Sequence, residues 1–374
     1  MKKVLFFITS LNGGGAEKVL LTLVNNLCQQ ERDYEITVHV LFGNGIYHKS
    51  LDKRIIQRAV LKHNFKYKTV EKVCKYLLMK MIRFLPAQIL HKMIVHKRYD
   101  IEIAYLEGMS TKIISGSSIT NKYAWIHTDP IAFPYSTNGY LSINEERKCY
   151  QKYKKIFGVS EGVCNAFKKK YKLPIEVLHN VIDTDLIKKM ALVDNEITMD
   201  SQCMNMVTVG RLVEQKGYDR LIKILGELKD KYNFRLYIIG EGKKEKELHE
   251  LAKQCNVEDK IIWKGFLNNP YPYIKQADFF VCSSISEGYS TAVTEAIILE
   301  TPVVTTNCAG MKEIFGCNNC GIITENSDNA LQKALEFILK NPDHLILYEK
   351  EAKKRAQDFQ IKLQLNEFKK AIFE

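Results

Sequence analysis

A chain of 374 residues is long for a single domain, and two domains of ordinary size are expected. Hydrophobic residues make up 46% and charged residues 26% of the composition, which excludes a disordered chain, and no apolar run approaches the roughly 18 residues that span a bilayer. Residues 1–180 carry 29 Lys and Arg against 14 Asp and Glu, an excess of 15 positive charges that is larger than the net charge of the whole chain, +12. Nucleic acid, an anionic membrane or a phosphorylated acceptor is therefore expected as a partner of this half.

The chain begins with an apolar run over residues 3–8, followed by Gly13-Gly14-Gly15 and a helical pattern from about 16 to 27. The apolar run is too short for a signal peptide and leads into glycines instead of a small-residue cleavage site. We interpret it as a buried first strand. With no secretion signal, we expect a cytoplasmic protein with reduced thiols.

The segment from Lys62 to Arg98 is strongly basic, with ten Lys and Arg against one acid, Glu71. Bulky apolar residues are interleaved with these charges, among them Phe65, Tyr67, Tyr76, Leu77, Leu78, Met79, Met81, Ile82, Phe84 and Leu85. A basic amphipathic helix of this kind can lie at a lipid interface, although an ordinary surface helix with solvated charges has the same pattern. We expect this segment to contact an anionic membrane surface, which would place the protein peripherally at the inner face of the cell membrane.

Further apolar strands are expected in the first half near 35–41, 101–105, 123–127 and 155–159, and the polar stretch 180–205 is expected to be a linker. The second half repeats the order of strand, glycine turn and helix, with strands expected at 206–211, 235–239, 261–263, 279–282 and 302–305. Continuous apolar strands that alternate with helices predict parallel sheets covered on both faces.

Each half therefore has the α/β pattern of its own doubly wound, Rossmann-like sheet. We expect domains at 1–185 and 186–355, with a final helical stretch, 356–374, packing back on the first domain.

In the second half, Cys317 and Cys320 have the spacing of half a zinc site, but no second pair follows and we interpret them as a turn with two thiols.

The loop after strand 206–211 contains two cations, Arg211 and Lys216, and ends at Gly217. Open α/β sheets bind ligands at the carboxyl ends of their strands. Arg211 can supply a planar fork and Lys216 a point charge to a diphosphate, although two cations in a surface loop are commonplace.

Two further strand ends carry weaker signals. Gly240 and Gly242 follow the strand 235–239, where they let the backbone approach a ligand or simply form a tight turn. Lys264-Gly265-Phe266 ends the strand 261–263, where a base could stack or bond to the main chain.

The strongest signal runs from Ser286 to Ala296, after the strand 279–282. A helix is expected to begin near Ser290, and the first N–H groups of a helix form an anion site. A diphosphate bound there would have Glu287 on its sugar side. Glu295 lies eight residues further, in a direction that suits a ribose, although it could equally be a solvent-facing helix carboxylate.

These spacings together resemble the family-4 retaining glycosyltransferases over nearly the whole chain, from Asn12-Gly13-Gly14-Gly15-Ala16-Glu17 to Gly310 and Glu313. The resemblance implies the GT-B fold, two Rossmann-like domains that face a central cleft. Glu287 and Glu295 match the E-x₇-E pair of the family. Ser290 stands where many members have glycine or proline, which leaves the shape of the sugar pocket open.

The resemblance also implies roles for individual residues. Glu287 is expected at the donor sugar, Glu295 at the ribose, and Arg211 with Lys216 at the diphosphate. His127 is similar to the family histidine that faces the sugar, and with Glu287, Lys216 and Arg211 it completes the expected catalytic set. The expected donor-binding residues are Gly14, Gly15, Arg211, Lys216, Gly240, Lys264, Gly265, Phe266, Glu287, Gly288, Tyr289, Ser290, Thr291 and Glu295.

The implied activity is retaining transfer of a hexose or N-acetylhexosamine from a nucleotide diphosphate sugar, with UDP as the default base, to a glycan or lipid-linked acceptor of bacterial polysaccharide synthesis. Glu287 and Glu295 are too far apart on a helical path for the carboxylate pair of a hydrolase. The resemblance implies front-face substitution instead. The only Asp-x-Asp, at 183–185, enters the predicted linker, so we expect no metal or other cofactor.

Three other classes remain as alternatives. A sugar-nucleotide epimerase or a phosphorylase can share the GT-B fold. A nucleic-acid-binding protein would explain the basic first half, but no binding motif is recognisable and we expect no nucleic-acid partner. A dinucleotide-dependent oxidoreductase would need G-x-G-x-x-G, which Gly13-Gly14-Gly15 does not provide.

Overall fold

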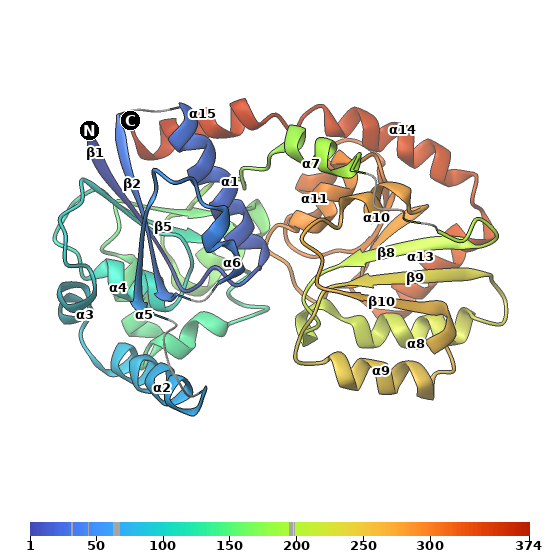
Figure 1. Ribbon diagram of the computed structural model, residues 1–374, viewed down its shortest axis with the longest axis horizontal. Helices are drawn as coiled ribbons and strands as arrows, with labels where there is room; N and C mark the ends of the chain where they lie inside the picture. The colour runs from blue at the N-terminus through green and yellow to red at the C-terminus, as the bar shows by residue number, and fades with distance from the viewer. Residues whose placement is uncertain (31–32, 44, 63–67, 194–196, 198) are drawn as a thin grey trace. The chain divides into compact units, whose positions relative to one another are not determined.

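The computed structural model describes residues 1–374 except 31–32, 44, 63–67, 194–196 and 198. The chain divides into two compact units, one made of Met1–Ile182 with Lys362–Glu374 and the other of Asp183–Ile361. Figure 1 shows the elements of both.

The first unit is built on a seven-stranded parallel sheet with the order β3-β2-β1-β4-β5-β6-β7. Its strands are β1 (Lys2–Ile8), β2 (Tyr34–Phe42), β3 (Ile56–Leu61), β4 (Ile101–Ala104), β5 (Lys122–Ile126), β6 (Lys155–Gly158) and β7 (Glu176–Val177). Residues 4–8 of β1 are fully buried, as their continuous apolar run predicts. Strand order reverses between β1 and β4, and such a switch point opens a crevice at the carboxyl ends of the strands.

The helices of the first unit are α1 (Gly15–Gln30), α2 (Lys68–Phe84), α3 (Ala87–Ile94), α4 (Met109–Ser115), α5 (Ile143–Tyr150), α6 (Glu161–Tyr171) and most of α15 (Ile361–Ile372), with 3₁₀ turns at Ile46–Ser50 and Tyr135–Gly139. The basic segment, expected as one helix, is two helices, because Pro86 stands at the start of α3 and a proline cannot continue α2. Phe65 and Tyr67, named in the sequence analysis, lie outside the described residues.

The second unit has a six-stranded parallel sheet with the order β10-β9-β8-β11-β12-β13. Its strands are β8 (Met204–Val209), β9 (Phe234–Ile239), β10 (Ile261–Gly265), β11 (Phe279–Cys282), β12 (Val303–Thr306) and β13 (Gly321–Thr324). The helices that flank it (Figure 1) are α7 (Thr184–Ala191), α8 (Tyr218–Leu228), α9 (Glu245–Gln254), α10 (Tyr271–Gln276), α11 (Thr291–Ile298), α12 (Met311–Phe315), α13 (Asp328–Lys340) and α14 (His344–Ala356). Here the order reverses between β8 and β11.

Three expectations about local structure were wrong. The stretch 180–205 is not all linker, because Asp183 accepts a hydrogen bond from the Leu186 N–H and caps α7. The Asp-x-Asp at 183–185, expected to enter that linker, therefore begins a helix. The helical stretch expected at 356–374 begins later, with α15 at Ile361, since the chain leaves helical geometry between residues 357 and 360. Residues 194–196 and 198 of the expected linker lie outside the described residues.

Candidate active site

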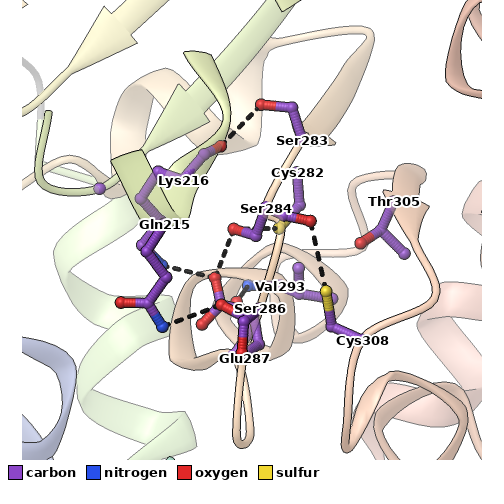
Figure 2. Close-up of polar contacts among 12 residues, drawn as sticks. Gln215, Lys216, Cys282, Ser283, Ser284, Ser286, Glu287, Val293, Thr305 and Cys308 are labelled. Carbon is purple, nitrogen blue, oxygen red and sulfur yellow. Dashed lines mark hydrogen bonds and ion pairs between the residues drawn. The ribbon is translucent and has the colours of Figure 1, made fainter. Parts of the chain in front are cut away.

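Two loops of the second unit lie side by side at the switch point of its sheet. One follows β8 and spans residues 210–217, and the other follows β11 and spans residues 283–290. The Ser283 hydroxyl donates to the Lys216 carbonyl at 2.9 Å, and the Ile285 N–H donates to the Gln215 carbonyl at 2.8 Å. Figure 2 shows this junction, with the side chains of Lys216 and Glu287 directed toward each other.

The central contact of the site is an ion pair between Lys216 Nζ and Glu287 Oε1, 2.6 Å apart. The Ser284 hydroxyl donates to the same carboxylate oxygen at 2.5 Å. Burial lowers the pKa of Lys216, but attraction to the Glu287 carboxylate and their hydrogen bond outweigh it, so the net pKa lies above the ordinary value. Lys216 is therefore a permanent cation with its charge held beside a carboxylate.

Gly217 allows the two loops to come this close. Its φ is +61°, and a Cβ at this position would lie 2.3 Å from the Ser283 carbonyl oxygen. A side chain here would push the Lys216 loop away from the Glu287 loop. Gly217 also carries the N-cap position of α8.

The helix expected near Ser290 begins there. Ser290 is the N-cap of α11, and its hydroxyl accepts a hydrogen bond from the Val293 N–H at 3.4 Å. Thr291 is the first residue of the helix. A small hollow of about 10 Å³, room for roughly one water molecule, is lined by Ser290, Lys216 and Ser284 together with residues of β8 and β11.

Glu295 lies inside α11 and is buried, with 4% of its surface exposed. The Tyr271 hydroxyl donates to its Oε1 at 3.3 Å. The alternative of a solvent-facing carboxylate is therefore wrong. A buried carboxylate with a polar partner can accept hydrogen bonds from vicinal hydroxyls, the chemistry expected of it.

Glycine is required at position 240 for a structural reason that the sequence did not reveal. Its φ is +141°, and a Cβ would come 2.0 Å from the Gly210 carbonyl oxygen. A Cβ at Gly242 would come 2.3 Å from the Leu212 carbonyl oxygen. These glycines let the loop after β9 pack against the loop after β8, which carries Arg211 and Lys216.

The residues at the end of β10 contact α10 and the loop after β9. Lys264 Nζ lies 5.2 Å from the ring centroid of Tyr273, and Gly265 has a φ of +62°. Phe266 is 39% exposed, and its N–H donates to Glu241 Oε1 at 3.3 Å. Of this group, the Phe266 ring is the surface most open to stacking.

The remaining donor-loop residues differ in exposure. Arg211 is exposed, and its guanidinium has no ion-pair partner among the described residues. Gly288 is buried, and its carbonyl oxygen lies 2.6 Å from where a Cβ of Gly310 would stand, so Gly310 fits here only as glycine. Burial raises the pKa of Tyr289 well above its ordinary range. Arg211 is thus the available cation of this edge and Lys216 the paired one.

In the first unit, His127 follows β5 and is 8% exposed. Burial lowers its pKa to about 3, so the imidazole is neutral at physiological pH. Its Nε2 atom is buried and without a hydrogen-bond partner among the described residues. Tyr105 and Trp125 pack around the ring, with centroid distances of 4.8 Å and 5.6 Å.

Gly14 and Gly15 stand at the start of α1, which begins at Gly15, one residue earlier than expected. Gly14 is buried, and a Cβ on it would come 2.1 Å from Glu17 Oε2. The preceding Gly13 has a φ of +94°, a conformation that favours glycine. Gly14, Gly15 and His127 belong to the first unit, whereas Lys216 and Glu287 belong to the second.

Two residues that hold these loops were not found from the sequence. Glu107 is buried and accepts from the His127 N–H at 2.9 Å and from the Thr128 hydroxyl at 2.5 Å. Burial raises its pKa, while these hydrogen bonds oppose the rise. Arg220, on α8, donates to the carbonyls of Ser283 and Ser284. Arg220 lies inside a helix and Glu107 in the loop between β4 and Gly108, and neither belongs to a motif with a recognisable spacing.

Comparison with known proteins shows which family the second unit matches. Residues 200–357 match the family described as glycosyl transferases group 1. The whole chain is 27% identical over 371 residues to the N-acetylgalactosamine-N,N'-diacetylbacillosaminyl-diphospho-undecaprenol 4-alpha-N-acetylgalactosaminyltransferase of Campylobacter jejuni, with 96% of each chain covered. The second unit carries a glycosyl transferases group 1 domain.

A second relative of this glycosyltransferase is the GalNAc-alpha-(1->4)-GalNAc-alpha-(1->3)-diNAcBac-PP-undecaprenol alpha-1,4-N-acetyl-D-galactosaminyltransferase of the same species, 23% identical over 396 residues, with 100% of this chain and 99% of that protein covered. Among solved structures, Anabaena HepE in complex with UDP and glucose is similar with a TM-score of 0.75 at 17% identity, covering 99% of each chain. The expected GT-B fold is confirmed. Over the described residues, no helix of the glycosyltransferase is both long and apolar enough to cross a membrane.

Proposed function

We propose that this glycosyltransferase moves an N-acetylhexosamine or hexose from a UDP-sugar to a glycan carried on a lipid diphosphate, with retention of the anomeric configuration. The observation that carries the proposal is the Lys216–Glu287 pair at the switch point of the second sheet, beside the start of α11. The names of the two Campylobacter relatives support N-acetylgalactosamine and an undecaprenyl diphosphate carrier, and the HepE complex supports UDP.

The proposed chemistry assigns a role to each charged group. Lys216, Arg211 and the first N–H groups of α11 stabilise the negative charge that develops on the departing diphosphate. Glu287 accepts hydrogen bonds from hydroxyls of the donor sugar, and Glu295 from those of the ribose. The bond from the anomeric carbon to the diphosphate oxygen breaks, a bond to the acceptor oxygen forms on the same face, and the acceptor proton passes to the phosphate oxygen.

Contacts of Glu287 favour this substitution over a covalent route. Its Oε1 atom bonds with both Lys216 and the Ser284 hydroxyl, which lowers the nucleophilicity of the carboxylate. In a retaining hydrolase, by contrast, two carboxylates lie about 5 Å apart and one attacks the sugar. We further propose that no metal ion takes part, so activity will persist in excess EDTA.

The lipid carrier of the proposed acceptor lies in a bilayer, and the first unit has an exposed apolar and basic surface suited to contact that bilayer. Val73, Leu77 and Phe84 are exposed on α2, at 52%, 59% and 60% of their surface. Lys80 lies over the rings of Tyr76 and Phe84 on the same helix. We propose that this face of α2 rests on the anionic surface of the membrane.

The function is tested with purified protein, UDP-N-acetylgalactosamine, and a polyprenyl diphosphate that carries a short N-acetylated glycan. We expect UDP release only when the acceptor is present, and an α-linked product by NMR anomeric coupling. An epimerase would change the donor sugar without acceptor, and a phosphorylase would require inorganic phosphate. A β-linked product would overturn retention while leaving transfer intact.

Variants of the central pair test the site itself. Glu287→Gln keeps the shape of the side chain and removes its charge. We expect kcat to fall by roughly 10²-fold or more, because one correctly placed charged group in an active site contributes a rate enhancement of that size. Lys216→Ala should lose at least as much. Lys223→Ala, an exposed lysine on α8, is the matched control and should retain full activity. Full activity in both site variants would refute the assignment.

A further inference from the structure

Arg220 is a buried cation bound mainly by main-chain oxygens. Only 7% of its surface is exposed, and it lies in the first turn of α8. Its Nε donates to the Ser283 carbonyl at 2.7 Å and its Nη2 to the Ser284 carbonyl at 2.6 Å. The Oδ1 atom of the exposed Asp328 is 3.8 Å from its Nη1. Arg220 is therefore satisfied chiefly by the loop that follows β11.

Four consecutive carbonyls of this loop, those of residues 283–286, have side-chain donors, the last from Gln215 Nε2 at 2.9 Å. Ser284 O also accepts from the Thr306 hydroxyl at 2.6 Å. Asn326 donates to the Ile285 carbonyl at 2.8 Å, and its own side-chain oxygen accepts from Arg220 Nη1 at 2.8 Å. After β11 ends at Cys282, these donors replace the ladder of the sheet and fix the path of the chain.

The loop that Arg220 fixes is the one that holds Glu287. While the Ser284 carbonyl accepts from Arg220, the Ser284 hydroxyl donates to Glu287 Oε1 at 2.5 Å. Figure 2 shows Ser284 standing between the strand end and the Glu287 carboxylate. A change in the position of Ser284 will therefore move the carboxylate relative to Lys216.

The shape of arginine matters for this arrangement. A guanidinium donates in several fixed directions in one plane, whereas a lysine presents one compact ammonium group. Gly217 leaves the room that the guanidinium needs, since a Cβ there would lie 2.9 Å from Arg220 Nε. Burying a cation against neutral carbonyls is a poor source of stability, which favours a role in geometry.

We propose that Arg220 is a positioning residue for sugar transfer, which holds the Ser283 and Ser284 carbonyls so that Ser284 sets the Glu287 carboxylate against Lys216. The proposal rests on the proposed roles of Glu287 and Lys216. Arg220 does not touch the donor and acts through the loop alone.

The first test is structural and independent of any substrate. Amide hydrogen exchange over residues 283–290 is compared between wild type, Arg220→Lys, and the control Lys223→Gln, which changes an exposed cation of the same helix. We expect at least tenfold faster exchange in Arg220→Lys alone, because lysine cannot hold two carbonyls and Asn326 together. Unchanged exchange would overturn the proposal.

The second test separates positioning from simple loss of structure. With UDP-N-acetylgalactosamine as donor, Arg220→Lys should lower kcat by roughly 10- to 100-fold, since small misplacements cost that much. The Kd for UDP measured by calorimetry should change by less than about threefold, because Glu287 faces the sugar and not the nucleotide. In a Glu287→Gln background, Arg220→Lys should cost less than about twofold more, as expected for residues that act as one unit.

Additive losses in the two backgrounds, or a parallel loss of UDP binding, would mean a general structural role and would overturn the proposal. Thr306→Val removes a different donor to the Ser284 carbonyl and should give a smaller effect of the same kind, which covers the case in which Arg220→Lys does not fold. If the wild-type protein binds no UDP and transfers no sugar, the proposed function fails, whereas the exchange measurement still decides whether Arg220 holds the Glu287 loop.

Discussion

Two histidines of the first unit show how burial alone changes the chemistry of a residue. His39 lies on β2, is 5% exposed and packs edge-on against Phe7. Burial, followed by repulsion from Arg58 and His96, lowers its pKa to about 4, and burial lowers the pKa of His127 to about 3. Both rings are therefore neutral in the folded protein across physiological pH.

This burial predicts acid sensitivity of the first unit. The folded-state pKa of His39 lies below the unfolded value of about 6.5, so its contribution to stability is complete above pH 6.5 and is lost as the pH falls toward 4. Between pH 7 and pH 5, we expect protonation of His39 to lower the free energy of unfolding by about 2 kcal/mol. His39→Leu should remove that part of the decline.

The measurement is urea unfolding of wild type and His39→Leu at the two pH values. The chain has two tryptophans, Trp125 in the first unit and Trp263 in the second, so a Trp263→Phe background lets Trp125 fluorescence report the first unit. Glu107 and Glu146 have raised pKa values and act in the opposite direction, equally in both proteins. Parallel pH dependences would show that folding does not lower the pKa of His39.

At the level of elements, α2 has two apolar faces. Leu78 and Ile82 are buried in the first unit, and Lys112, itself fully buried, donates to the Arg83 carbonyl at 2.8 Å. These contacts fix which face of the helix is turned outward. Residues 70, 73, 77 and 84 have the spacing of a single stripe and are exposed, with Lys72, Lys80 and Arg83 beside them.

The stripe predicts binding to anionic lipid. Leu77→Glu with Phe84→Glu should weaken binding to vesicles of phosphatidylglycerol at least tenfold, because each buried apolar side chain contributes about 1.5–3 kcal/mol. Ile346→Glu with Leu347→Glu changes two equally exposed apolar residues of α14 and is the control. Co-sedimentation gives the affinities, and equal binding by both double variants would contradict a role for α2.

At the scale of the whole molecule, the last element of the chain is part of the core of the first unit. Residues 362–374 belong to that unit although residues 183–361 intervene in the sequence. Phe368 of α15 is fully buried and stacks on Phe6 at 6.1 Å and on Trp125 at 5.8 Å between ring centroids. The core of the first unit is therefore complete only when α15 has been made.

Phe368→Ala should lower the unfolding free energy of the first unit by about 3–5 kcal/mol, since it leaves a cavity among aromatic rings. Leu363→Ala, on the same helix with 54% of its surface exposed, should cost less than about 0.5 kcal/mol. Trp125 fluorescence during urea unfolding gives both values. Equal, small effects would mean that α15 contributes little to the core.

The sequence predicted the class of fold because long apolar runs such as residues 4–8 of β1 can only be strands buried on both faces. It missed β3, β7 and β13, which are the edge strands at three ends of the two sheets. β3 is half-buried and contains Gln57 and Arg58, β7 has only two residues, both exposed, and β13 begins with a glycine. The helix α7 was missed because the cap at Asp183 is a single contact in a polar stretch.

Candidate site residues were predictable wherever they follow strands, as Lys216 and Glu287 do, because parallel strands bring their carboxyl ends to one edge. Their family was predictable from the same motifs. The glycines at 240 and 242 were noted in the sequence, but the need for glycine there was not predictable. It comes from their close approach to Gly210 and Leu212, which depends on two loops far apart in sequence.

What the sequence determined by itself was periodicity and spacing, which set the strands, the helices and the loops that bear charge. Which side chains are buried and which distant groups they contact followed from the fold alone, as Glu107, Arg220 and Phe368 show. The physical reason is that burial and hydrogen bonding across long separations depend on the packing of all elements together, whereas local patterning depends on neighbours along the chain.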